Sequence, residues 1–364
     1  GLTFALKVAQ AGRSVCILTK KDRAESNTNY AQGGIAAVTS EGDDFERHVS
    51  DTMQSGADLC NEEVVRAIVK AAPSGIQELI QLGVDFTRLE DGRHSLGKEG
   101  GHTKRRVLHV KDITGKAIEE ALLDGIAKEG VTVLEHFFVI DLITSEKLRH
   151  RGIEVPGHGD RLLGLYALNV KSGEVETFRS RSLVLATGGV GRVYQYTTNP
   201  SIATGDGVAM AWRAGATIAN MEFVQFHPTC FYNPAAIGPE ARSFLVSEAL
   251  RGEGAVLLNE NGENFTRDYD KRGSLAPRDI IARAIDTEIK KTGAHCVYLD
   301  VTHKPKGFVA QRFPFIYQTL LEFGHDAEAA PIPVVPAAHY QCGGVVATPD
   351  GTTSIRGLFA IGEV

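Results

Sequence analysis

The stretch that decides the fold class reads Ser182-Leu183-Val184-Leu185-Ala186-Thr187-Gly188-Gly189. Its first half is a short continuous apolar run, which is typical of a strand buried on both faces of a parallel sheet. The abrupt change to Thr-Gly-Gly is expected where the carboxyl end of such a strand meets a ligand in the crevice of the sheet. The stretch therefore predicts an α/β fold with a ligand at the carboxyl edge of its parallel strands.

The beginning of the chain resembles the second half of a strand-helix-strand unit. Apolar residues recur at helical spacing over residues 1–11, Gly12 ends the helix, and residues 14–19 form an apolar strand. Gly1 would be the last glycine of a dinucleotide-binding fingerprint if a strand and a Gly-x-Gly turn preceded it. That signal is weak by itself, because Thr19-Lys20 stands where the fingerprint places a ribose-binding acid.

Composition narrows the class of protein. A chain of 364 residues predicts two or three domains, and 43% hydrophobic with 23% charged residues is ordinary for a globular enzyme. A net charge of -6 without a long basic run argues against a nucleic-acid partner. No apolar run is long enough to span a bilayer, so no membrane partner is expected.

The five cysteines are scattered and form no Cys-x-x-Cys pair. This favours reduced thiols and a cytoplasmic location over a disulfide framework or a zinc site. The chain lacks an initiating Met and starts inside a helical pattern, so we expect its natural N-terminus to lie upstream. An organellar transit peptide therefore stays an open alternative.

The sheet pattern breaks between Met221 and Tyr340, which predicts a second domain inserted into the first. The predicted Rossmann-like domain covers residues 1–220 and returns over residues 341–364. Residues 221–340 are predicted to form a smaller α+β capping domain that holds the substrate.

Several local interpretations follow from capping and turn signals. Asn61 is predicted to cap a helix that Pro73 stops, and residues 145–161 are predicted to form an exposed hairpin loop. The charges of residues 98–106 are attributed to a solvated loop when taken alone. For Asp206, capping of the following helix is favoured over contact with a cofactor hydroxyl.

Arg278 breaks a local rule. Pro277 suits the first position of a helix, which places Arg278 in the first turn, where the helix dipole disfavours a cation. Two positive sources aimed at one spot suggest a bound anion or a developing negative charge. The alternative is a surface arginine paired with Asp279 or with an acid elsewhere.

A small molecule with carboxylates would suit the polar residues of the inserted segment and its edges, which are His227, Ser247, Arg278 and His339. Each histidine alone is more often a packing residue. No pair has metal-ligand spacing and no Gly-x-Ser-x-Gly elbow is present, so no metal is expected and hydrolase chemistry is disfavoured. The glycine pair within residues 26–37 suits either a cofactor cradle or a plain turn.

A resemblance connects these motifs. Ala31-Gln32-Gly33-Gly34-Ile35, Ala186-Thr187-Gly188-Gly189, Gly205-Asp206-Gly207, Gln225-Phe226-His227-Pro228-Thr229, Leu275-Ala276-Pro277-Arg278-Asp279 and Gly362-Glu363 occur in the order seen in the succinate dehydrogenase and fumarate reductase flavoproteins. The likeness covers essentially the whole chain. It implies an FAD-binding domain interrupted by a capping domain.

Within that superfamily the sequence is most similar to the L-aspartate oxidase family. The respiratory flavoproteins hold FAD covalently through a histidine in a Ser-His-Thr motif, whereas this chain has Ser26-Asn27-Thr28. The resemblance therefore implies non-covalent FAD. Glu99-Gly100-Gly101-His102 resembles the oxidase motif whose glutamate faces the substrate amino group, a contact that would not help succinate.

The resemblance also implies residue roles. It makes Arg278 the proton-transfer residue and Glu99 the partner of the amino group, with His227, Ser247 and His339 on the substrate carboxylates. It places FAD against Gly1, Lys20, Asn27, Thr28, Asn29, Tyr30, Ala31, Gln32, Gly33, Gly34, Asp206 and Glu363.

The activity implied is oxidation of L-aspartate to iminoaspartate for NAD biosynthesis, with oxygen or fumarate reoxidising the flavin and quinolinate synthase as a potential partner. The alternatives are a soluble fumarate reductase or related dicarboxylate oxidoreductase, and a flavin-free scaffold.

Overall fold

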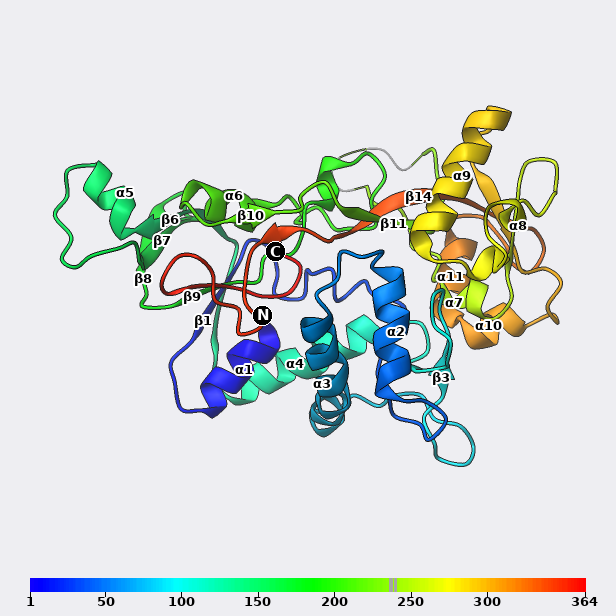
Figure 1. Ribbon diagram of the computed structural model, residues 1–364, viewed down its shortest axis with the longest axis horizontal. Helices are drawn as coiled ribbons and strands as arrows, with labels where there is room; N and C mark the ends of the chain where they lie inside the picture. The colour runs from blue at the N-terminus through cyan, green and yellow to red at the C-terminus, as the bar shows by residue number, and fades with distance from the viewer. Residues whose placement is uncertain (236–237, 239–240) are drawn as a thin grey trace. The chain divides into compact units, whose positions relative to one another are not determined.

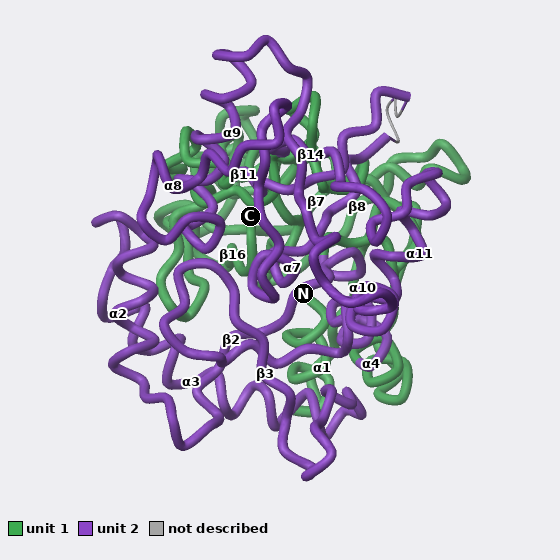
Figure 2. The backbone as a smooth tube through the Cα atoms, turned by 90° about the vertical axis from the view of Figure 1, so that its right-hand side faces the viewer, with its two compact units in different colours: residues 1–27, 122–225, 338–364 green, residues 28–121, 226–337 purple. Residues whose placement is uncertain are grey.

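The computed structural model describes residues 1–235, 238 and 241–364. These residues form two compact units, each assembled from several segments of the chain (Figure 2). Unit 1 holds residues 1–27, 122–225 and 338–364, and unit 2 holds residues 28–121 and 226–337.

The domain boundaries drawn from the sequence, with an inserted domain over residues 221–340, stay a prediction. Unit 2 combines most of that segment with residues 28–121. The two segments share hydrogen bonds, for example from the Gly100 amide to Glu248 at 2.9 Å.

Parallel strand pairs organise unit 1. Strand β9 (Leu183–Leu185), the stretch that predicted the fold class, pairs in parallel with β16 (Leu358–Ala360). Strand β1 (Cys16–Thr19) pairs in parallel with β5 (Thr132–Glu135), and helix α1 (Leu2–Gln10) precedes β1. The predicted α/β class and its parallel strands are therefore confirmed.

Unit 1 also contains a three-stranded antiparallel sheet. It consists of β6 (Phe137–Thr144), β7 (Leu162–Asn169) and β8 (Val175–Arg179). Helix α5 (Ser145–His150) joins β6 to β7 (Figure 1), so the predicted exposed hairpin loop is wrong over its first part. The helix forms because the Thr144 hydroxyl accepts the Lys147 amide at 3.3 Å and so caps its first turn.

The remaining elements of unit 1 are short. A core of buried apolar side chains from the antiparallel sheet, β9, β16 and helix α6 holds the unit together. These elements are η1 (Gly191–Val193), α6 (Asp206–Arg213), β10 (Ile218–Ala219) and β15 (Gly344–Val345).

A four-stranded sheet and its helices form the main core of unit 2. The sheet has the order β11-β14-β13-β12, and helix α9 packs its apolar face into the core that the sheet residues build. Ile281, Ala284 and Ile285 of α9 are buried, as their helical spacing predicts, and burial of each large apolar side chain contributes roughly 1.5–3 kcal/mol. The strands are β11 (Val224–Phe231), β12 (Val256–Leu258), β13 (Val297–Asp300) and β14 (Ile332–Gln341), and the helices are α7 (Ala249–Gly252), α8 (Thr266–Tyr269), η2 (Gly273–Leu275), α9 (Arg278–Thr292), α10 (Phe308–Arg312) and α11 (Pro314–Glu322).

The segment of residues 28–121 adds a small sheet and a helix pair to unit 2. Strands β2 (Ile35–Ala36), β4 (Val107–Leu108) and β3 (Leu96–Gly97) are antiparallel, with β4 in the middle. Helices α2 (Phe45–Ser55) and α3 (Glu62–Gln81) lie side by side (Figure 1), and α4 (Thr114–Lys128) follows β4.

Helix α3 corrects one expectation. Asn61 caps it as predicted, by accepting the Val64 amide at 3.3 Å, but Pro73 lies inside the helix and does not stop it. Val69 and Ile76 are buried on either side of the proline. Packing of this apolar face outweighs the one backbone hydrogen bond that the proline removes.

A buried ion cluster anchors the loop that follows β3. Arg106 is fully buried and binds Asp43 at 2.7 Å and Asp51 at 2.6 Å. Asp51 also accepts the amide and hydroxyl of Thr103, both at 2.9 Å. Residues 98–106 are therefore not a fully solvated charged loop, because the guanidinium of Arg106 is buried inside unit 2.

Replacing Arg106 with alanine is expected to lower the free energy of unfolding by about 3–5 kcal/mol, because it leaves two buried carboxylates without a cation. Burial raises the pKa of Asp43 and Asp51, but their hydrogen bonds, chiefly to Arg106 and Thr103, outweigh it and hold both pKa values below the ordinary 3.8. Their contribution to stability is present above pH 3.8 and is lost as the pH falls below it.

Urea unfolding at several pH values measures this effect. The control is Arg47→Ala, whose side chain is 51% exposed in its pair with Asp44, and which should cost about 0–1 kcal/mol. An Arg106→Ala protein as stable as the control would contradict the assignment.

Among the described residues, no helix is both long enough and apolar enough to cross a bilayer.

Candidate active site

Arg278 is the first residue of α9, and Pro277 serves as the N-cap rather than the first helical residue. Its guanidinium Nε donates to the Glu248 carboxylate, and its Nη2 lies 3.6 Å from Oε2 of Glu99. Asp279 pairs instead with Arg283 at 2.6 Å on the exposed side of the helix. Of the alternative, the pairing with Asp279 is therefore wrong, and Arg278 pairs with acids elsewhere in the chain, Glu248 and Glu99, as a half-buried side chain.

Glu248 and Arg251 extend the cluster inward. Glu248 immediately precedes α7, and Nη2 of Arg251 lies 2.9 Å from its Oε1. Arg251 is fully buried and donates through Nη1 to the Ser274 carbonyl at 2.7 Å. The result is a row of alternating charges, Arg251, Glu248, Arg278 and Glu99, all within unit 2.

The row separates the pKa values of its two acids. Burial raises the pKa of Glu99, and the nearby charge of Arg278 reduces that rise without cancelling it. Burial acts the same way on Glu248, but Arg278 and Arg251 together outweigh it and lower its pKa. Two neighbouring carboxyls with opposite shifts are a typical arrangement for acid and base roles.

Arg278 is held in its charged form. Burial lowers the pKa of its guanidinium, but the attraction of Glu248 and Glu99 outweighs this, and the net pKa is raised. The helix N-terminus disfavours a cation at this position, but in the structure the two carboxylates counteract that effect. Arg278 is therefore suited to carry a positive charge that balances negative charge at the site.

Glu99 lies on the loop after β3 with a half-buried side chain. A Cβ on Gly33 would lie 3.0 Å from Oε1 of Glu99, so Gly33 allows the carboxylate to approach the loop closely. Glu99, which is followed by a glycine pair in the sequence, thus lies against Gly33.

The three predicted substrate-binding residues divide between the units. His227 on β11 is buried, and its Nδ1 accepts the Thr229 amide at 3.3 Å, which leaves Nε2 as the protonated nitrogen of the neutral ring. Ser247 is buried next to Glu248, in the same unit as Arg278 and Glu99. His339 belongs to unit 1, where its Nδ1 lies 2.7 Å from the Thr198 hydroxyl.

Polar groups of unit 1 gather near the carboxyl ends of β9 and β16. Glu363 accepts the Gln341 amide at 2.9 Å and the Asn27 side-chain amide at 3.1 Å. Oδ1 of Asn27 is buried and has no hydrogen-bond partner among the described residues. A Cβ on Gly189 would collide with the Glu363 carboxylate, so the backbone is kept bare at this edge. These features fit a dinucleotide.

Gly1, Lys20 and Asp206 also lie in unit 1. A Cβ on Gly1 would lie 3.3 Å from that of Ala186, which agrees with the close helix-sheet packing predicted for this glycine. Lys20, at the end of β1, binds Asp206 at 2.5 Å. The N-cap of α6 is Gly205, so the capping role favoured for Asp206 is wrong and its carboxylate points to Lys20 instead.

The predicted FAD-binding residues Thr28, Asn29, Tyr30, Ala31, Gln32, Gly33 and Gly34 form a loop of unit 2. The Gly115 amide donates to the Ala31 carbonyl at 2.9 Å, and Thr114 donates to the Gly33 carbonyl, so the start of α4 fixes the loop. Oε1 of Gln32 is buried without a partner among the described residues. Gly34 is required by packing on β4, because a Cβ there would lie 2.1 Å from the Leu108 carbonyl oxygen. The unused Gln32 acceptor is consistent with a ligand at this loop.

Comparison with known proteins decides the family. A family model described as an FAD binding domain matches residues 1–364. L-aspartate oxidase of Vibrio cholerae is 50% identical over 370 residues, which cover 100% of this chain and 67% of the relative. The chain belongs to the L-aspartate oxidase family.

Other members of the L-aspartate oxidase family agree with this assignment. L-aspartate oxidase 2-a of Nicotiana tabacum, which is named chloroplastic, is 47% identical over 100% of this chain and 56% of its own length.

A solved structure of a different enzyme is also similar. Quinol fumarate reductase of E. coli matches with a TM-score of 0.88 and 31% identity, covering 100% of this chain and 62% of that one. FAD as the cofactor is confirmed, and the chain spans roughly two thirds of these bacterial relatives.

Two charged residues of the candidate site, Glu248 and Arg251, are not predicted from the sequence. Among residues 242–254 only Ser247 is predicted as a site residue. The sequence does hold an indication, because an acid and an arginine three residues apart follow Val246, which is buried. Such charges on a short buried helix need partners, and Arg278 is one.

Proposed function

We propose that the protein oxidises L-aspartate to iminoaspartate, as the first step of NAD biosynthesis through quinolinate. FAD, when bound, supplies the hydride acceptor at N5. The observation that carries the proposal is the Glu99 carboxylate beside Arg278, in a pocket that Ser247 also lines. A carboxylate there attracts the ammonium of an amino acid and would repel a plain dicarboxylate.

The surrounding residues would fix the substrate. We assign His227, Ser247 and His339 to binding of the carboxylates of aspartate. Arg278 would balance the negative charge of these carboxylates and take part in proton transfer. FAD would be held without a covalent bond by Gly1, Lys20, Asn27 and residues 28–34, Asp206 and Glu363. Asn27 supports non-covalent binding, because an amide side chain forms no bond to flavin carbon.

Oxidation of aspartate to the imine releases one proton besides the hydride. Glu99 is the base that fits this proton best, because it faces the amino group in this proposal and its pKa is raised by burial toward the working range. Arg278, which Glu248 holds in its charged form, would be the acid when the site reduces a double bond, because that reaction must give a proton to a carbon.

A second candidate function is reduction of fumarate. The row of Arg251, Glu248 and Arg278 would supply a proton to a substrate carbon, and the structural likeness to quinol fumarate reductase favours this capacity. We therefore propose that oxygen or fumarate accepts the electrons from the flavin, and that Glu99 selects aspartate as their donor.

Replacing Glu99 with glutamine or alanine is expected to slow flavin reduction by L-aspartate about a hundredfold, while fumarate reduction by a reduced dye changes much less. In the unmodified protein the rate should rise with pH through a pKa above the ordinary 4.5 of glutamate, because only the ionised carboxylate can take the proton. Rapid-mixing kinetics between pH 5 and 9 would measure both effects. Equal losses in the two reactions would count against the role of Glu99.

Two further assignments stay proposals. A partnership with quinolinate synthase would suit an unstable imine product, and it can be tested by co-purification of the two full-length proteins. The cytoplasmic location stays a prediction, since the tobacco relative carries a chloroplast name.

A further inference from the structure

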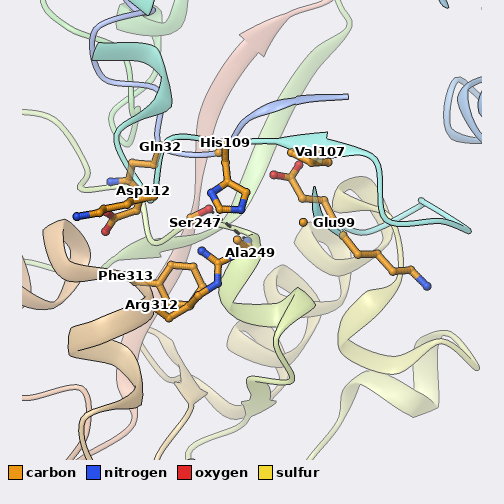
Figure 3. A pocket seen from close by; sticks show the side chains of 13 residues that line it. Gln32, Glu99, Val107, His109, Asp112, Ser247, Ala249, Arg312 and Phe313 are labelled. Atoms are coloured by element: carbon orange, nitrogen blue, oxygen red, sulfur yellow. Dashed lines mark hydrogen bonds between the residues drawn. The ribbon is translucent and has the colours of Figure 1, made fainter. Parts of the chain in front are cut away.

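A small space lies beside Glu99, which is one of the residues that line it. Its lining comes entirely from unit 2, and Figure 3 shows His109 at its centre with Gln32, Asp112, Ser247 and Arg312 around it. The space has room for on the order of one water molecule. Glu99 therefore borders both the charge row and this space.

The side chains around the space are buried but lack partners. His109 is 5% exposed and Asp112 is 2% exposed. Neither ring nitrogen of His109, nor Oδ1 of Asp112, nor Oε1 of Gln32 has a hydrogen-bond partner among the described residues. Three such groups around one space would be costly if dry, and they provide the partners that a buried water requires.

His109 has the properties of a neutral relay. Burial, and then the charge of Arg312, lower the pKa of its imidazole to about 4, against a weaker opposing effect of the Lys111 backbone and of Glu253. A neutral ring can accept a proton at one nitrogen and release one from the other. Oδ2 of Asp112 is fixed by the Ile316 amide at 2.9 Å, so its Oδ1 is left to orient the water or the ring.

The space also has an outlet. Arg312 lines it and lies 3.5 Å from Glu253, and both side chains are 24% exposed. The other charge row ends inward at Arg251, which is fully buried and bonded to the Ser274 carbonyl. The route through His109 thus ends at partly exposed ionisable groups, whereas the charge row is partly exposed at Arg278 and ends at the buried Arg251.

We propose that this space holds an ordered water and that His109 relays a proton from Glu99 toward Glu253 and solvent during aspartate oxidation. The inference rests on the proposed function. The ammonium N–H bond breaks, the electron pair stays on nitrogen, and the proton bonds to a Glu99 oxygen. That proton then passes to the water, which gives one of its own to a ring nitrogen of His109, and the other ring nitrogen releases its proton outward. Glu99 is thereby restored as a base.

The test compares His109→Ala with His94→Ala in the flavin-loaded full-length protein. His94 is a half-buried histidine of unit 2, and it does not line the space. His109→Ala should slow anaerobic flavin reduction by L-aspartate at least about tenfold, and imidazole should restore the rate. 1-Methylimidazole keeps one basic ring nitrogen but has a methyl group in place of the N–H, so it cannot pass a proton through and should not restore the rate. Fumarate reduction should stay within about twofold.

A loss that imidazole does not restore, or no loss, would overturn the relay. His109→Gln must show the same slowing without rescue, which guards against misfolding of the alanine variant. A crystal structure of the full-length protein gives a readout independent of activity: it should show a water bonded to His109 and Asp112, and a dry space would overturn the proposal. If L-aspartate fails to bleach the unmodified protein, the proposed function fails; if it does bleach and His109→Ala is equally fast, only the relay fails.

Discussion

Replacing Arg278 with leucine is expected to lower flavin reduction by L-aspartate at least about a thousandfold while FAD stays bound. The change removes the cation between Glu99 and Glu248 and with it the charge that would hold the substrate carboxylates. Leucine keeps most of the side-chain volume, so α9 retains its packing. Stopped-flow absorbance gives the rate, and the flavin spectrum of the purified protein gives the occupancy.

Arg283→Leu is the matched control for that change. Arg283 lies on the same helix, is 74% exposed and pairs with Asp279. Its replacement should leave the rate unchanged and cost less than about 1 kcal/mol of stability. Turnover retained in Arg278→Leu would remove Arg278 from the centre of the site.

Glu248→Gln should have the second-largest effect, with a loss of about a hundredfold in fumarate reduction and about 3 kcal/mol in the free energy of unfolding. Glutamine can still accept the Gly100 amide, but the fully buried Arg251 loses its counter-charge. The negative charge of Glu248 also raises the pKa of Glu99. Its removal should therefore shift the pH midpoint of aspartate oxidation downward.

Denaturant unfolding and the pH dependence of flavin reduction together check this prediction. Asp286→Asn is the control, because Asp286 pairs with Lys290 on the same unit but is 57% exposed. If Glu248→Gln were as stable and as active as the control, the charge row would be a packing feature without a role in proton transfer.

The fold was largely readable from local patterns. The apolar run before Thr187 predicts a buried parallel strand, and in the structure this strand pairs in parallel with the strand at Leu358. The errors arose where tertiary contacts override local signals. Pro73 was expected to stop a helix, but burial of Val69 and Ile76 carries the helix through it. The loop at Ser145 contains a helix that a threonine caps.

The sequence predicts only some of the residues of the candidate site. Arg278 was found because a cation at a helix N-terminus breaks a local rule, and Glu99 was found through the family resemblance. Glu248, which binds Arg278 and the Gly100 amide, was missed, because nothing local shows that an acid at residue 248 lies beside these residues. His109 was missed for the same reason, since a buried histidine without partners is visible only when its surroundings are known.

In our proposal the site removes hydride from an amino acid, and Glu99 makes it prefer L-aspartate to succinate. Anaerobic addition of L-aspartate, D-aspartate and succinate to separate samples of the flavin-loaded full-length protein tests it most directly. We predict that L-aspartate alone bleaches the flavin absorbance. Bleaching by succinate alone, or no bleaching while a reduced dye drives fumarate reduction, would contradict the account and establish a dicarboxylate reductase in its place.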